Sequence, residues 1–298
     1  MSRWVAVGLL LLTATIFAAN HIAARVAFDH GVDVVTAVAV RSGTTALVLL
    51  LFLRLARVPL ALDRRTAGRA VVVGLLLAVQ SYGLYSAVAL IPVALALLTF
   101  NTFPFLLALL SWAASGVRPA RRTFLAMLVA LFGLSLALDV AGRVSLDGGP
   151  GFAARWATIG PGVAHALVAS LAFAGVLYLT TRWLAALEAR LRTVLTMGVV
   201  SLVAIAAGVI GGGLALPAEP LAWVGLALLT VFYGIAFTMM FAILPRVGAV
   251  ENAALLNFEP IASLGLAWAI LGQAVAPIQV AGALIVIAAV VVIGLRRD

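Results

Sequence analysis

The chain has 298 residues, of which 65% are hydrophobic and 10% are charged, and it contains no cysteine. This composition lies far outside the range of soluble globular domains, indicates a chain embedded in lipid, and excludes disulfides and thiolate metal sites. The net charge of +9 comes from arginines that lie mostly between apolar segments, so membrane orientation explains it better than nucleic-acid binding, and no nucleic-acid partner is expected.

Ten apolar segments follow one another along the chain, each near the roughly 20 residues that a helix needs to cross the hydrocarbon. The first five predicted helices cover residues 4–27, 35–54, 69–91, 94–115 and 122–140. The second five cover residues 158–181, 192–213, 221–244, 250–271 and 277–295. A turn-forming Gly-Gly-Pro-Gly cluster at 148–151 separates the halves, which predicts one unit over residues 1–147 and a second over 152–298. We therefore predict an all-α membrane protein with ten transmembrane helices.

The first segment also resembles a signal peptide, because Arg3 precedes an apolar run over residues 4–17. The run continues to about Phe28, and its removal would destroy the even number of helices. We expect it to be retained as the first helix.

The arginines predict the orientation of the chain. With the N-terminus in the cytoplasm, fifteen arginines fall on the cytoplasmic side, and only Arg143 and Arg155 fall in the opposite loops. The positive-inside rule then places both termini in the cytoplasm, as expected for a multi-pass protein of the bacterial inner membrane.

The two halves of the chain resemble each other around their fourth helices. An Asn, a Pro and a Trp recur there at a constant interval, as Asn101, Pro104 and Trp112 and again as Asn257, Pro260 and Trp268. Because each half has an odd number of helices, the second begins on the opposite side of the membrane, which makes an inverted repeat. Such halves can exchange conformations and open a midplane site to either side in turn, although a purely structural repeat is the alternative.

A family resemblance rests on the stretch from Asn252 to Pro260, on Leu271-Gly272-Gln273 with the helix that follows it, and on Asn20 and Arg41. With these features the chain resembles, over nearly its full length, the EamA family of the drug/metabolite transporter superfamily. The resemblance implies two five-helix repeats, and among the branches of the family we expect the YddG type, which exports aromatic amino acids and related compounds. Gln273 departs from the family pattern, which commonly has a Glu at this position.

Glu259 is the most informative candidate, because it is a carboxylate halfway through the predicted ninth helix, where the fourth helix has Phe103. It could bind a substrate ammonium, take up a coupling proton, or form a structural pair with Arg41 or Arg25. Pro104 and Pro260 each free a backbone carbonyl one turn earlier, so they either kink the helix or form hinges beside the pathway.

Further polar and aromatic side chains lie near mid-span, where polar groups are costly and are expected to face partners or a wet cavity. Their mixture suits a flat, partly apolar solute, and interhelical packing is the alternative for each. With Glu259, the predicted substrate-binding residues are Asn20, His21, Gln80, Tyr82, Tyr85, Asn101, His165, Tyr233 and Asn257.

These features predict a gradient-driven exporter of amino acids, aromatic or other neutral, and of similar small metabolites by alternating access. No phosphate-binding loop or lysine is present for ATP-driven transport. The expected partners are a small-molecule substrate and the lipid bilayer; no oligomeric state is predicted, and a monomer suffices. A multidrug exporter of organic cations such as methyl viologen is the alternative. An intramembrane enzyme would need paired carboxylates or a His-rich motif, so no catalytic residue, cofactor or metal is expected.

Overall fold

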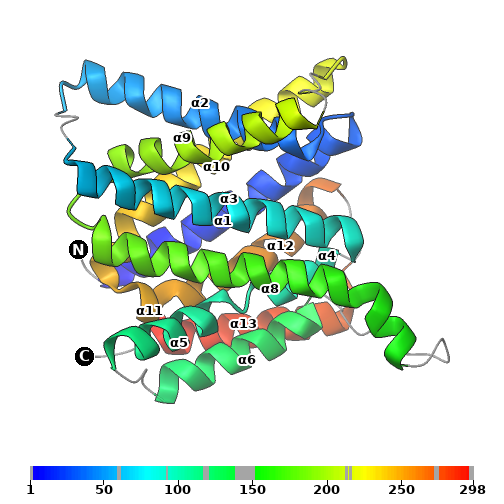
Figure 1. Cartoon of the computed structure of the whole chain (residues 1–298). Helices are drawn as coiled ribbons and strands as arrows, with labels where there is room; N and C mark the ends of the chain where they lie inside the picture. Colours follow the sequence, from blue (N-terminus) through cyan, green and yellow to red (C-terminus); the bar gives the residue numbers. More distant parts are fainter. Residues whose placement is uncertain are drawn as a thin grey trace.

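The computed structural model of the chain is a bundle of helices (Figure 1). It describes residues 3–58, 62–91, 93–116, 121–137, 152–211, 214, 217–271 and 275–294. The proposed boundary between the halves at 148–151, and Gln273, lie outside these residues.

Each segment that the sequence predicts is helical in the described part of the chain. The first half contains α1 (Arg3–Asp29), α2 (Val34–Leu55), α3 (Arg64–Leu90), α4 (Val93–Phe100), α5 (Phe103–Ser115) and α6 (Arg121–Ala137). The second half contains α8 (Phe152–Trp183), α9 (Ala189–Ile210), α10 (Pro220–Val247), α11 (Ala249–Asn252), a 3-10 helix (Ala253–Phe258), α12 (Glu259–Leu271) and α13 (Pro277–Gly294).

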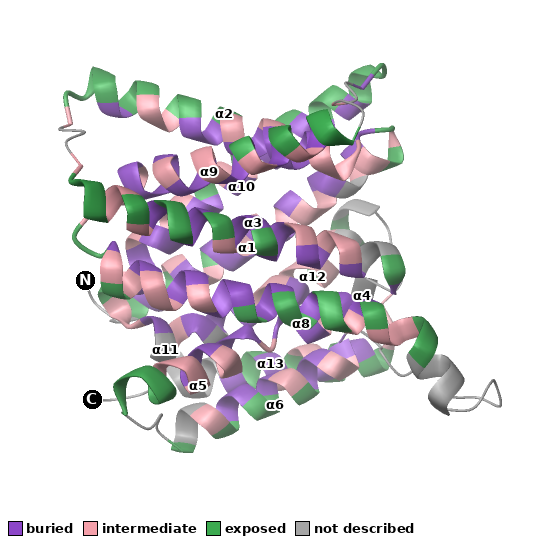
Figure 2. Ribbon diagram, in the orientation of Figure 1, coloured by how far each residue is buried: buried purple, intermediate pink, exposed green. Residues whose placement is uncertain are grey.

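The outer surface of the bundle is apolar, as lipid requires. Large side chains on the lipid-facing sides are widely exposed, among them Leu47 at 68%, Leu202 at 68% and Ile210 at 87% (Figure 2). Exposing so much apolar surface to water would be strongly unfavourable, whereas lipid tails are as apolar as these side chains. Seven spans among the described residues are long and apolar enough to cross a membrane, and three apolar helices are shorter. The chain is a multi-pass membrane protein.

The helix pairings are symmetric between the halves. α1 packs against α10 as α3 packs against α8, and α1 packs against α12 as α8 packs against α5. The pairs α2 with α9 and α6 with α13 join corresponding helices of the two halves. Exchanging the halves therefore maps each of these pairings onto another of them or onto itself, which is the pattern that two similar units related by a two-fold axis would produce.

The predicted fourth and ninth helices are each interrupted at the expected proline. In the first half α4 ends at Phe100, and α5 begins at Phe103 with Pro104 as its second residue. In the second half the 3-10 helix ends at Phe258, and α12 begins at Glu259 with Pro260 as its second residue. Proline is well accommodated in the first turn of a helix, where its missing N–H would have no intrahelical partner. The interruptions place short, non-α backbone in the middle of the bundle.

The helices α6 and α13 approach each other closely at glycines. A Cβ added to Gly282 would lie 2.2 Å from the backbone nitrogen of Ala137 and 2.5 Å from the carbonyl oxygen of Gly133. Real Cβ contacts are never so short, and backbone atoms cannot rotate away. Gly133 and Gly282 thus set the spacing of α6 and α13.

We expect Gly282→Ala to destabilise the protein by about 1–3 kcal/mol, because the added methyl group forces the two backbones apart. Thermal unfolding of the detergent-solubilised protein measures this change. Gly198→Ala is the matched control, since nothing lies within 4 Å of a Cβ at that helical position. Its free energy of unfolding should stay within about 1 kcal/mol of the wild-type value. Any change should be an increase, because Ala favours helix more than Gly. Equal effects of the two variants would contradict close packing at Gly282.

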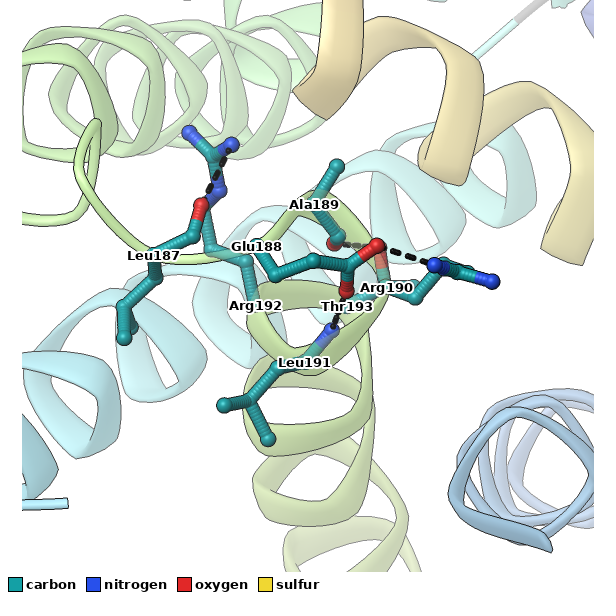
Figure 3. A network of polar contacts seen from close by, with 7 residues as sticks. All are labelled: Leu187, Glu188, Ala189, Arg190, Leu191, Arg192 and Thr193. Atoms are coloured by element: carbon teal, nitrogen blue, oxygen red, sulfur yellow. Dashed lines mark hydrogen bonds and ion pairs between the residues drawn. The ribbon is translucent and has the colours of Figure 1, made fainter. Parts of the chain in front are cut away.

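The start of α9 is fixed by a local polar network (Figure 3). The Leu191 backbone N–H donates to Glu188 Oε2 at 3.0 Å, and Arg190 Nε donates to Glu188 Oε1 at 2.5 Å. Partial burial acts to raise the pKa of the Glu188 carboxyl, but these hydrogen bonds outweigh it and hold the pKa below its ordinary value of 4.5. The ionised Glu188 therefore stabilises the folded state at neutral pH.

Because the pKa of Glu188 is lower in the folded state, its contribution is fully present above pH 4.5 and is lost as the pH falls through the lower folded value. Glu188→Gln should lower the melting temperature at pH 7, and the gap to wild type should close as the buffer is acidified below pH 4.5. Melting curves of both proteins from pH 3 to pH 7 check this. A gap that does not change with pH would contradict the assignment.

Candidate functional site

A cavity with apolar walls and a few polar side chains lies where helices of both halves meet. Its volume is about 60 Å³, small beside the roughly 300–1,000 Å³ of pockets that hold a drug-sized ligand. The residues that line it are Phe17, Asn20, His21, Arg41, Gln80, Ser81, Leu84, Tyr85, Phe100, Phe103, Phe173, Tyr233, Phe237, Leu256 and Glu259. They come from α1, α2, α3, α4, α5, α8, α10, the 3-10 helix and α12.

Arg41 is the buried cation of this cavity. Its side chain is only 4% exposed, Nη1 donates to the Tyr85 hydroxyl at 2.9 Å, and Nη2 donates to Ser81 Oγ at 3.4 Å. The guanidinium carbon also lies 3.9 Å from the centroid of the Tyr233 ring, a cation–π distance. No carboxylate of the described residues forms an ion pair with it, and Nε has no hydrogen-bond partner there. A buried guanidinium held by neutral groups alone is well suited to receive an anionic group.

Glu259 pairs with a histidine. Its Oε1 lies 2.6 Å from His21 Nε2, which joins the first residue of α12 to α1. A pairing with Arg41 was one of the alternatives for Glu259; in the structure the carboxylate pairs with His21, and Arg41 is held by Tyr85 and Ser81. The start of α12 favours the carboxylate, since the partial positive charge of a helix N-terminus stabilises an anion.

Two further buried oxygen atoms beside the cavity have no hydrogen-bond partner among the described residues. They are Asn20 Oδ1, on a side chain 2% exposed, and the hydroxyl of Tyr233, on a side chain 3% exposed. A buried polar atom without a partner costs about 1–3 kcal/mol. A bound solute with hydrogen-bond donors would remove this cost.

Aromatic rings form the apolar walls. Phe103 and Phe173 meet edge to face with centroids 4.8 Å apart, and Phe100 lies 5.5 Å from Phe173. Phe17 meets Phe237 edge to face with centroids 5.1 Å apart. Stacking and edge-to-face contacts of this kind favour a flat ring as ligand.

Four pairs of cavity residues are separated by the 156-residue interval of the repeat. They are Phe17 and Phe173, Phe100 and Leu256, Phe103 and Glu259, and Ser81 and Phe237. Both halves of the chain therefore contribute residues to the site. In the third pair one half supplies an aromatic ring and the other a carboxylate, so the cavity itself is chemically asymmetric.

Six of the ten predicted substrate-binding residues line the cavity together: Asn20, His21, Gln80, Tyr85, Tyr233 and Glu259. The other four are not among its lining residues. Asn101 is buried and donates to the Leu97 carbonyl at 2.8 Å, which holds the end of α4, and Asn257 is 1% exposed at the corresponding break. Tyr82 is only partly buried, and His165 is exposed on α8.

The lining residues that were not predicted from the sequence are Arg41, Ser81, Leu84, Leu256 and the phenylalanines. A single arginine in the middle of an apolar span was a usable signal for Arg41, since such residues are costly in hydrocarbon and tend to be functional. The phenylalanines carry no such signal, because apolar residues face lipid, core and cavity alike. The expected hinge prolines, Pro104 and Pro260, are the second residues of α5 and α12, the second parts of the two interrupted helices.

Comparison with known proteins agrees with this architecture. The model of the EamA-like transporter family matches residues 4–138 and again residues 160–295. A solved crystal structure superposes with a TM-score of 0.77 at 19% sequence identity, over 98% of this chain and 96% of the other. No curated protein matches the chain. The two family matches fall on the two halves of the helix bundle.

Proposed function

Because the chain belongs to the EamA-like transporter family, we propose that it is a gradient-driven exporter of aromatic and other neutral amino acids that works by alternating access. The observation that carries this proposal is the charge arrangement of the central cavity. Arg41 is a buried cation with no carboxylate partner among the described residues, and the His21–Glu259 pair lies on the same cavity. A zwitterion offers a carboxylate to the first group and an ammonium to the second.

The aromatic walls add a preference for a ring. A phenylalanine or tryptophan side chain would stack among Phe103, Phe173 and Phe237, while its charged groups meet Arg41 and Glu259. Tyr85 and Tyr233 already orient the guanidinium, so less ordering is needed when a substrate carboxylate binds.

The size of the cavity supports a mechanism in which the helices around it move. At about 60 Å³ it is too small for an amino acid, so the helices around it must separate to admit one. The interrupted helices begin their second parts at Phe103 and Glu259, directly at the cavity, and Pro104 and Pro260 make them natural hinges. Inverted repeats over residues 1–147 and 152–298 would let one arrangement open inward and its mirror open outward.

The arginines support the orientation that we propose. Arg69 lies over the Trp183 ring at 5.6 Å and Arg190 over the Phe52 ring at 5.1 Å, which brings the end of α2 and the starts of α3 and α9 together with the end of α8. This arginine-rich end, at the left of Figure 1, is the proposed cytoplasmic end in the bacterial inner membrane.

Counterflow in proteoliposomes tests the function directly. Vesicles loaded with unlabelled phenylalanine should accumulate external labelled phenylalanine transiently, and protein-free vesicles should not. The absence of counterflow for phenylalanine, tryptophan and threonine would reject amino-acid transport.

Export of organic cations is the second candidate, and Glu259 favours it because a carboxylate beside aromatic rings is typical of cation sites. The buried charge of Arg41 opposes it, since a cation must then enter beside another cation. Methyl viologen counterflow separates the two: the amino-acid proposal expects none, or far less than with phenylalanine.

A further inference from the structure

A second cavity lies at the arginine-rich end, away from the central site. Its volume is about 500 Å³, and it is formed by the connection from α8 to α9, the first turn of α9 and the last turns of α10. The residues that line it are Ala185, Ala186, Leu187, Glu188, Ala189, Arg190, Arg192, Thr238, Ala242, Pro245 and Arg246. The central cavity shares none of them.

Arg192 is the notable residue of this cavity, because its charge is buried and incompletely satisfied. The side chain is 3% exposed, and Nη2 donates to the Leu187 carbonyl at 3.2 Å. Nε and Nη1 have no hydrogen-bond partner among the described residues. Figure 3 shows its guanidinium beside Leu187, pointing away from the Glu188–Arg190 pair. A buried guanidinium with two unpartnered nitrogens calls for an anionic acceptor.

The charge balance of the cavity also favours an anion. Arg246, at the end of α10, lies on the same cavity and is close enough to act electrostatically on Arg192. Glu188 is the acidic side chain of the lining, and it is engaged by Arg190 at 2.5 Å. The pair of Glu188 and Arg190 is neutral as a unit, so Arg192 and Arg246 leave the cavity with a net charge of +2.

An apolar groove begins where the basic cavity ends. It runs between α2 and α10 with a volume of about 370 Å³, and Thr238 belongs to both linings. The side chains along it are apolar or are threonines, and Val48, Val231 and Ile235 are 59%, 55% and 45% exposed on the lipid-facing surface. The groove is therefore open to the hydrocarbon of the membrane. Two of its threonines are satisfied within α10: Thr230 Oγ1 donates to the Leu226 carbonyl and Thr238 Oγ1 to the Gly234 carbonyl, each at 2.7 Å.

We propose that an anionic phospholipid binds here, with its phosphate between Arg192 and Arg246 and an acyl chain in the groove between α2 and α10. A basic cavity at the membrane surface that continues into a lipid-facing apolar groove matches the two ends of such a molecule. Inorganic phosphate would occupy only the basic cavity and leave the apolar groove empty. The site is separate from the central cavity, and the inference does not depend on what the protein transports.

Lipid titration of the purified protein tests the site. The melting temperature is measured in detergent micelles with increasing dioleoylphosphatidylglycerol, with dioleoylphosphatidylcholine in parallel, and with inorganic phosphate alone. Phosphatidylglycerol should raise the melting temperature in a saturable way, because a ligand that binds only the folded state stabilises it, and phosphatidylcholine should not. Equal stabilisation by the two lipids would overturn the proposal.

Three variants locate the effect. Arg246→Gln, at an exposed position, should raise the phosphatidylglycerol concentration needed for half-maximal stabilisation at least about tenfold. Arg65→Gln changes an exposed arginine of α3 that does not line the cavity, and it should leave this concentration unchanged. Ile235→Trp fills the groove and should weaken phosphatidylglycerol but not inorganic phosphate. An unchanged midpoint in Arg246→Gln excludes the site. If inorganic phosphate stabilises the protein as much as the lipid does, and Ile235→Trp has no effect, the site binds a free anion. That outcome excludes the phospholipid.

Discussion

Arg41→Gln is expected to reduce the kcat/KM for phenylalanine export by roughly 100-fold or more, because it removes the buried cation that receives the substrate carboxylate. Removing one partner of a buried, hydrogen-bonded charge pair typically costs about 3–5 kcal/mol, and about 1.4 kcal/mol corresponds to a factor of ten. The variant also leaves the Tyr85 and Ser81 hydroxyls without the donor that the wild-type guanidinium supplies. Transport assays in proteoliposomes measure the loss.

Substrate analogues separate a binding role of Arg41 from a structural one. Phenethylamine lacks the carboxylate of phenylalanine, so its weak binding should not fall further in Arg41→Gln, whereas binding of phenylalanine should fall. Arg41→Lys keeps the charge but loses the planar donor geometry, and it should recover part of the phenylalanine transport. A loss of the same size for both ligands would mean that Arg41 acts through the fold and not through the carboxylate.

The helices of this protein were predictable because each follows from local composition. A run of about 20 apolar residues crosses the membrane as a helix, since the hydrocarbon offers no hydrogen-bond partner to an unpaired backbone group. The breaks before Pro104 and Pro260 were signalled by the prolines themselves. The breaks turned the expected fourth and ninth helices into shorter pieces, because backbone at these points lies within the protein, where lipid does not reach it.

The composition of the cavity was only partly predictable, because helical direction decides which side chains meet. On α3, the residues Gln80, Ser81, Leu84 and Tyr85 share one face and line the cavity, while Tyr82 points elsewhere. In a soluble helix the apolar stripe would reveal the inward face, but here lipid and core are both apolar and the stripe is lost. The same difficulty applies to His165, which is exposed on α8 and is not among the lining residues.

The partner of Glu259 could not be deduced from the sequence. His21 and Glu259 are 238 residues apart, and their contact depends on how α1 packs against α12. The repeat alone gave a more limited result: it identified Glu259 as the residue in place of Phe103. Both positions line the cavity, so the asymmetry noticed in the sequence is an asymmetry of the site.

Glu259→Gln is expected to weaken phenylalanine binding by roughly 10- to 100-fold, because the substrate ammonium loses a charged acceptor. Hydrogen bonds to charged groups contribute about 1.5–3 kcal/mol, which corresponds to this range. Glutamine keeps the size of the side chain and one carbonyl oxygen near His21 Nε2, so the cavity should keep its shape. Equilibrium binding of labelled phenylalanine to the purified variant measures the change.

The two cavity variants should respond to analogues in opposite ways. The acid 3-phenylpropionate lacks the ammonium, so Glu259→Gln should bind it at least as well as wild type, because a carboxylate facing an anionic ligand has been removed. Arg41→Gln should bind it much more weakly. Glu219→Gln, an exposed carboxylate at the start of α10, is the matched control and should behave as wild type with every ligand. If Glu259→Gln weakens the acid and phenylalanine equally, the carboxylate does not contact the ammonium, and its role is to hold His21 on α1 against α12.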